Sequence, residues 1–197
     1  MGFPLEQELR AERHRLISTL DQLPGPVFES GLTLCTEWSP RDILAHLMAV
    51  DDAAATYLPY GPFVHAANRR QVERARRVPR SSLMARARAW ADRPSLTSRI
   101  GAVVTLGDLA VHHQDIVRGL GLDRELAPAV PTFILWDGAL LSLSTNLRIL
   151  RFRIVPTDGY PALGAHSHNL PEARGSREAL GMWLAGRESV AEELTFA

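Results

Sequence analysis

The sequence predicts a mainly α-helical protein, in which an antiparallel four-helix bundle over residues 1–148 is followed by a small α+β segment over residues 149–197. Two patterns support this fold class. In the first part, apolar residues recur every three or four positions, as they do along one face of an amphipathic helix. After about residue 149, apolar residues alternate with charged ones, which is typical of a half-buried strand.

Composition restricts the possible functions. The chain has 22 basic and 22 acidic residues among 197, so its formal net charge is zero and no global positive field would draw it to nucleic acid or a membrane surface. A secretory signal and a long apolar span are both missing from the sequence. The single cysteine, Cys35, excludes an internal disulfide, and we interpret it as a small buried side chain. We therefore expect a soluble, cytoplasmic monomer or homodimer with no nucleic-acid or membrane partner.

Two helices are predicted before residue 60. The first covers about residues 5–23, where leucines recur among charged residues, and Pro24 ends it. The second covers about residues 40–57. Ser39 suits the N-cap of this helix, and Asp42, three positions later, can return a hydrogen bond to the cap. This capping box fixes the start of the second helix.

An arginine-rich segment follows, over residues 69–99. It holds ten arginines against two acids, Glu73 and Asp92. Ser81 or Ser82 is expected to cap a helix there, which Pro94 stops. The arginines have two interpretations: solvated helix faces packed across the bundle, or a guanidinium cluster that binds an anion such as a substrate carboxylate.

The helix predicted over residues 105–119 carries the most informative polar residues. Asp108 and His112 lie one turn apart on the same face, with Asp115 three residues further. Apolar neighbours would partly bury these groups, so they need partners, and a divalent metal is one candidate. Two ligands from one helix do not close a metal site. The best further donor is His46, on the inward face of the second helix.

The remaining elements differ in character. The helix over about residues 132–147 is apolar around most of its circumference, so we expect it to complete the bundle as its most buried helix. A strand is predicted over residues 150–155, with further strands in 162–168 and 172–174 and closing helices at about 176–185 and 189–194. His166 and His168 would share one face of a strand, so a His-x-His metal pair is an alternative site.

Three segments together resemble a known family. They read Trp-Ser-Pro-Arg-Asp-Ile-Leu-Ala-His-Leu at residues 38–47, Asp-x-x-x-His-x-x-Asp-Ile-x-x-Gly-Leu-Gly at 108–121, and Gly-x-x-x-x-Leu-x-x-Trp-Leu-x-Gly-Arg at 175–187. In this order and spacing they resemble the mycothiol-dependent maleylpyruvate isomerase family of the DinB/YfiT-like superfamily. Each motif alone is weak, and the order and spacing make the match specific.

The resemblance implies a DinB-like bundle and a particular site. His46, Asp108 and His112 would hold a divalent metal, zinc in the first instance, with nickel and iron as alternatives. Mycothiol would be the thiol cosubstrate, and Arg187, at the end of the third motif, would bind the anionic substrate. Asp115 would support a ligand or stabilise the helix locally rather than bind the metal. Asp108 stands where the family has glutamate, one methylene longer, so direct ligation requires a closer helix or an intervening water.

The activity implied by this resemblance is isomerisation of, or thiol transfer to, a small electrophile such as maleylpyruvate. The thiol would add to a cis double bond and then either depart after rotation or remain on the product. The alternative is a non-catalytic binding or regulatory protein that keeps the fold without a working metal site, since a fold does not fix a function.

Overall fold

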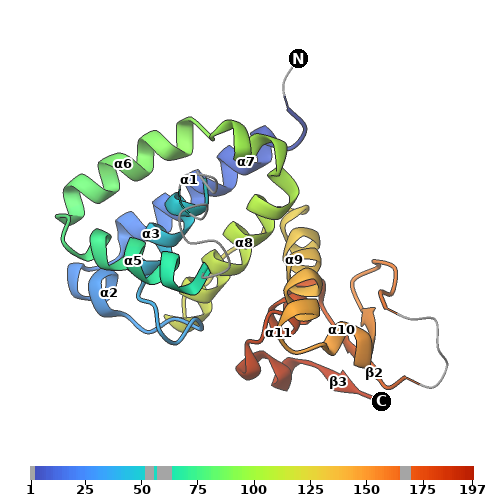
Figure 1. The fold of residues 1–197 in the computed structure, drawn as a ribbon. Coiled ribbons are helices and arrows are strands. Elements are labelled where there is room, and N and C mark those ends of the chain that lie inside the picture. The colour runs from blue at the N-terminus through green and yellow to red at the C-terminus, as the bar shows by residue number, and fades with distance from the viewer. Residues whose placement is uncertain (1–2, 52–55, 57–63, 165–169) are drawn as a thin grey trace. The chain divides into compact units, whose positions relative to one another are not determined.

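The computed structural model describes residues 3–51, 56, 64–164 and 170–197. The chain folds into two compact units, Met1–Asp123 and Arg124–Ala197 (Figure 1). It is mainly helical with a small C-terminal sheet, which confirms the predicted fold class. Among the described residues, no helix is both long and apolar enough to cross a membrane.

The described part of the first unit is built from helices. These are α1 (Glu6–Gln22), α2 (Gly25–Ser30), α3 (Pro40–Asp51), α5 (Val64–Arg76), α6 (Arg80–Asp92), α7 (Leu96–Ile100) and α8 (Ala102–Gly119). Helix α1 packs against α6 and α8, and α3 packs against the same two helices, so these four close a ring around one core. Helix α5 covers the outside of α3.

The bundle therefore recruits a different fourth helix from the one predicted. Helix α6, from the arginine-rich segment, takes the place that we assigned to residues 132–147. It can do so because one stripe of α6 is apolar and buried, comprising Leu83, Met84, Ala87 and Ala91. The helix at 132–147 instead belongs to the second unit, and the division at Asp123 lies upstream of the expected boundary at 148.

The capping interactions at the helix starts agree with the sequence at α3 and disagree at α6. Ser39 N donates to Asp42 Oδ2 at 3.2 Å, and Asp42 N donates to Ser39 Oγ at 3.4 Å, which completes the predicted capping box. Helix α6 begins at Arg80, after Pro79, without a side-chain cap. The prediction that a serine caps α6 is wrong, because the fixed backbone angle of proline already suits a helix start.

A buried ion pair links α1 to the end of α3. The fully buried guanidinium of Arg13 contacts Asp51, donates to Trp90 O at 2.8 Å and stacks over the Trp90 ring at 4.2 Å. Burial lowers the pKa of Arg13, and the neighbouring Asp51 carboxylate opposes this shift. The pair ties α1 to the end of α3, since separating the two charges would leave each unpaired in the core.

The second unit combines helices with a sheet. It contains α9 (Val130–Ser144), α10 (Arg148–Arg151), β1 (Arg153–Pro156), β2 (Glu172–Gly175), α11 (Arg177–Leu184), a 3₁₀ helix η2 (Glu188–Glu193) and β3 (Thr195–Phe196). The sheet order is β1-β2-β3, with β1 parallel to β2 and β3 antiparallel to β2. The hydrophobic core of the second unit consists of Leu135, Ile154, Ala173, Leu180, Trp183 and Leu184.

The predicted strand over residues 150–155 is only partly correct. Leu150 lies in α10, and the strand begins at Arg153. The short helix forms because Asn146 Oδ1 accepts from Arg148 N and Ser142 Oγ accepts from Ile149 N, so side chains satisfy the start of α10. Strand β2 matches the strand expected at 172–174. His166 and His168 lie outside the described residues.

Helix α9 is less buried than expected. Trp136, Leu140 and Leu143 are 42%, 52% and 50% exposed, whereas α8 is buried along most of its length. The inner face of α9 approaches α11 closely, because a Cβ atom at Gly138 would overlap the backbone of Gly181. Since this contact uses one face of α9 only, its remaining apolar residues face outward.

Candidate metal centre

Three of the predicted site residues lie together in the first unit. His46 comes from α3, and Asp108 and His112 come from α8. Their potential ligand atoms all lie within 4.8 Å of one another. Nε2 of His46 is 3.7 Å from Asp108 Oδ2, and Nε2 of His112 is 3.6 Å from Asp108 Oδ1. The Asp108 carboxylate thus faces both imidazoles.

Local structure explains this arrangement. Asp108 and His112 are four residues apart in α8, so both side chains project from the same face. His46 lies on the buried side of α3, which packs directly against α8. Both histidines are buried and Asp108 is partly exposed, so the cluster lies at the edge of the core.

Asp115 sets the orientation of His112. The fully buried Asp115 places Oδ2 2.9 Å from His112 Nδ1. A carboxylate at this distance favours the tautomer with the proton on Nδ1, which would leave Nε2 as the nitrogen that could bind a metal. The contact brings Asp115 to His112, and its role in supporting a metal ligand stays a prediction.

The loop before α3 supplies two residues that the sequence interpretation did not place here. The Trp38 ring centroid is 4.7 Å from that of His46 and 5.7 Å from that of His112, so the indole covers both imidazoles. Cys35, which we expected to be simply buried, is partly exposed and forms a second group of possible ligands with His112 and Asp115. Backbone pairing of Leu34 N to Asp115 O, at 3.0 Å, holds this loop on α8.

The donor set fits a divalent metal. Two imidazole nitrogens and a carboxylate oxygen are the ligands of many catalytic zinc sites, where bonds of about 2.0–2.1 Å place neighbouring ligand atoms about 3.3 Å apart. The separations of 3.6 and 3.7 Å at Asp108 are only slightly wider. The shorter aspartate side chain therefore reaches both histidines without help from a longer glutamate.

The adjacent histidine serves a structural contact. His113 is fully buried, with Nδ1 2.8 Å from Glu12 Oε1 and Nε2 2.9 Å from Thr19 Oγ1. These partners come from α1, so His113 points away from the Asp108 cluster and joins α8 to α1. Of these two consecutive histidines of α8, His112 therefore faces the Asp108 cluster and His113 faces α1.

Arg187 belongs to the second unit. Its Nη1 donates to Ala185 O at 2.6 Å, and the side chain is partly buried. Its role in binding an anionic substrate stays a prediction.

Several arginines of the segment 69–99 bind other parts of the first unit. Arg76 forms an ion pair with Asp42 at 2.6 Å, and this hydrogen bond raises the pKa of Arg76. Arg80 donates to the carbonyl oxygens of Leu20 and Leu23. Further ion pairs join Arg88 to Asp21 and Arg99 to Glu6. These arginines stabilise the bundle.

Comparison with solved structures identifies the fold. A mycothiol-dependent maleylpyruvate isomerase superposes with a TM-score of 0.67 at 14% identity, over 98% of this chain and 93% of that chain. A histidine-to-alanine mutant of such an isomerase gives the same TM-score and coverage at 13% identity. No family model and no curated protein sequence matches this chain. The chain therefore has the fold that its three motifs predicted.

Proposed function

We propose that this chain, which has the fold of a mycothiol-dependent maleylpyruvate isomerase, is a metal-dependent enzyme that uses a low-molecular-weight thiol on a small electrophile. One observation carries the proposal: His46, Asp108 and His112 bring three metal-ligand atoms within 4.8 Å of one another inside this fold. Such a donor set leaves a coordination position for a thiol of the mycothiol class.

The residues around the cluster have distinct tasks. His46 and His112 offer imidazole nitrogens, and Asp108 offers the carboxylate between them. Asp115 keeps Nδ1 of His112 protonated, and Trp38 shields the imidazoles from water on one side. A divalent metal, zinc in the first instance and nickel or iron as alternatives, would lower the pKa of a thiol that binds beside it.

The reaction that suits maleylpyruvate is reversible thiol addition. The thiolate sulfur forms a bond to one carbon of the cis double bond, and the electron pair of that bond moves onto the conjugated carbonyl. Rotation about the resulting single bond follows. The carbon–sulfur bond then breaks, the double bond returns in the trans form, and the thiol is recovered unchanged. In a transferase, a proton would instead be added to carbon and the thioether released.

A non-catalytic binding protein is the second candidate. It is supported by the side chains themselves, since Asp108 lies within ion-pair distance of both histidines and Asp115 pairs with His112. Such a network of charges can persist in a folded protein without a metal. The two candidates differ in whether the purified protein binds a metal and whether that metal meets a thiol.

Cobalt substitution followed by thiol titration tests the proposal. Mycothiol added to the cobalt-loaded protein should produce a sulfur-to-cobalt charge-transfer band, because this band requires a bond between the two atoms. The band should be absent in His46→Ala and His112→Ala and retained in His14→Ala, which alters an exposed histidine paired with Asp92.

Thiol-dependent isomerisation of maleylpyruvate by the zinc-loaded protein should accompany the band. Arg187→Ala should keep the band and lower turnover if the guanidinium holds the substrate carboxylate. A protein that binds no metal supports the binding-protein candidate. If the spectrum of the metal-loaded protein does not change when any thiol is added, the proposed thiol-dependent reaction is contradicted.

A further inference from the structure

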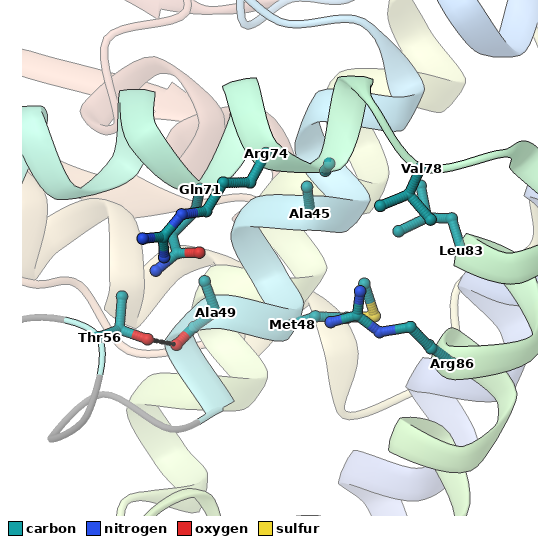
Figure 2. A pocket seen from close by; sticks show the side chains of 10 residues that line it. Ala45, Met48, Ala49, Thr56, Gln71, Arg74, Val78, Leu83 and Arg86 are labelled. Carbon is teal, nitrogen blue, oxygen red and sulfur yellow. Dashed lines mark hydrogen bonds between the residues drawn. The ribbon is translucent and has the colours of Figure 1, made fainter.

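A cavity of about 350 Å³ lies beside α3, on the side covered by α5 and α6 (Figure 2). Its lining comprises Ala45, Met48, Ala49, Thr56, Gln71, Arg74, Ala75, Val78, Leu83 and Arg86. None of these residues belongs to the Asp108 cluster. Helix α3 turns Ala45 and Ala49 toward the cavity and His46 toward α8, so the cavity is separate from the metal centre.

Two arginines enter this cavity from different helices. Arg74 extends from α5 and Arg86 from α6, and Figure 2 shows their guanidinium groups on opposite sides of α3. Within the described part of the chain, neither group has an ion pair, in contrast to Arg76 and Arg88, which pair with Asp42 and Asp21. Both side chains are exposed, so a ligand from solution can reach them. Among the described residues, the cavity thus holds two positive charges without an acidic partner.

The rest of the lining determines what else a ligand must carry. The lining also includes the small apolar side chains of Ala45 and Ala49 on α3, and the Met48 thioether lies beside Arg86 in Figure 2. The Thr56 hydroxyl already donates to Ala49 O at 2.8 Å, so it can only accept a further hydrogen bond. The donors available to an anion are therefore the guanidinium groups and the Gln71 amide, with apolar surface between them.

We propose that this cavity binds a small organic dicarboxylate. Each planar guanidinium can pair with one carboxylate through two hydrogen bonds, and a short carbon skeleton can lie against the alanines between them. Ligand pockets usually measure about 300–1,000 Å³, so this volume suits a small acid rather than a nucleotide. The inference does not depend on the metal centre, because no residue is shared.

Isothermal titration of the full-length protein with succinate tests the site. Binding should be saturable, and Arg74→Gln and Arg86→Gln should each weaken it about tenfold or more, because charge-assisted bidentate pairs are strong. Arg69→Gln is the matched control: it removes the same charge from α5 at an exposed position outside the cavity, and it should leave binding unchanged. Dimethyl succinate, which has the same skeleton without charge, should not bind.

Two further variants distinguish binding in this cavity from binding at the protein surface or at the metal centre. Ala49→Leu fills the cavity and should abolish succinate binding while circular dichroism shows an intact helical fold. His112→Ala removes a residue of the proposed metal centre and should leave succinate binding intact, so failure of either proposal can be recognised separately. The proposed site would be overturned if Arg69→Gln weakened succinate binding as much as the cavity variants do. It would also be overturned if Arg74→Gln and Arg86→Gln did not weaken succinate binding. Tighter arginine-dependent binding of inorganic phosphate would overturn the ligand class.

Discussion

The Asp115 carboxylate decides which nitrogen of His112 faces Asp108. Asp115→Asn keeps the size of the side chain but removes the charge that holds the proton on Nδ1. We expect the zinc affinity of this variant to fall about 10–100-fold, the usual effect of losing such a supporting partner. Competition with a chromophoric chelator measures the change, and Asp92→Asn, at an exposed aspartate, is the control. Unchanged affinity in Asp115→Asn would mean that packing alone orients His112.

Asp108 can be tested by restoring the longer side chain. Its oxygens already lie 3.6 and 3.7 Å from the two histidine nitrogens, so one added methylene lets the carboxylate approach a shared ion more closely. Asp108→Glu should therefore raise the zinc affinity or leave it unchanged, as measured by the same competition. Loss of metal from Asp108→Glu, with tight binding by the parent protein, would show that the site is shaped around aspartate.

The contact between α9 and α11 depends on two glycines. In Gly138→Ala the new methyl group would overlap the backbone of Gly181, so the helices must separate. We expect a loss of about 1–3 kcal/mol in the free energy of unfolding, measured with urea. Gly25→Ala is the control, because the nearest atom to its new methyl would be Arg80 Nη1 at 4.0 Å. Equal stability of Gly138→Ala and the parent would contradict this close approach.

The sequence predicted best those elements whose signals are local. The reciprocal bonds between Ser39 and Asp42 start α3 where the capping box placed it, and Ser176 caps α11 at its expected start. The fourth helix of the bundle was misassigned, because the arginines of α6 concealed its apolar stripe while the strongly apolar stretch at 132–147 seemed better suited. Which apolar faces meet is a property of tertiary packing that single-helix periodicity does not encode.

The candidate site, like the fold, was predicted best where the signal in the sequence is local. The i, i+4 spacing of Asp108 and His112 already indicated a shared face, and the inward side of the second helix indicated His46. Spacing could not show that Trp38 would cover both imidazoles or that Cys35 would lie beside Asp115. Those positions depend on the loop before α3, which is held on α8 by a backbone hydrogen bond.

Low pH should lower the stability of both units, because each contains a glutamate that pairs with arginines. Hydrogen bonds from Arg10 and Arg99 lower the pKa of Glu6 in the first unit, and hydrogen bonds from Arg174 and Arg153 lower that of Glu172 in the second. A lowered folded-state pKa gives stability that is present above the ordinary value of 4.5 and is lost as the pH falls through the folded-state value. The urea midpoint should therefore drop between about pH 5 and pH 3.

Removing one of these carboxylates tests the cause. Glu172→Gln should show a shallower decline of the urea midpoint with acid than the parent protein, because it no longer takes up that proton. Glu125→Gln, at an exposed carboxylate outside the described ion pairs, should decline as the parent does. If the urea midpoints of Glu172→Gln and the parent depended on pH in the same way, Glu172 would not contribute to the loss of stability in acid.

The ion pairs of both units share one chemical feature, which is that arginine is their cation. The sequence contains no lysine, so the cations that hold Asp42, Asp51 and Glu172 are all guanidinium groups. A guanidinium remains charged well into the alkaline range and has no amine for an acetyltransferase or an amine-reactive cross-linker to attack. Enzymes that regulate proteins by acylating lysine side chains therefore cannot discharge these contacts.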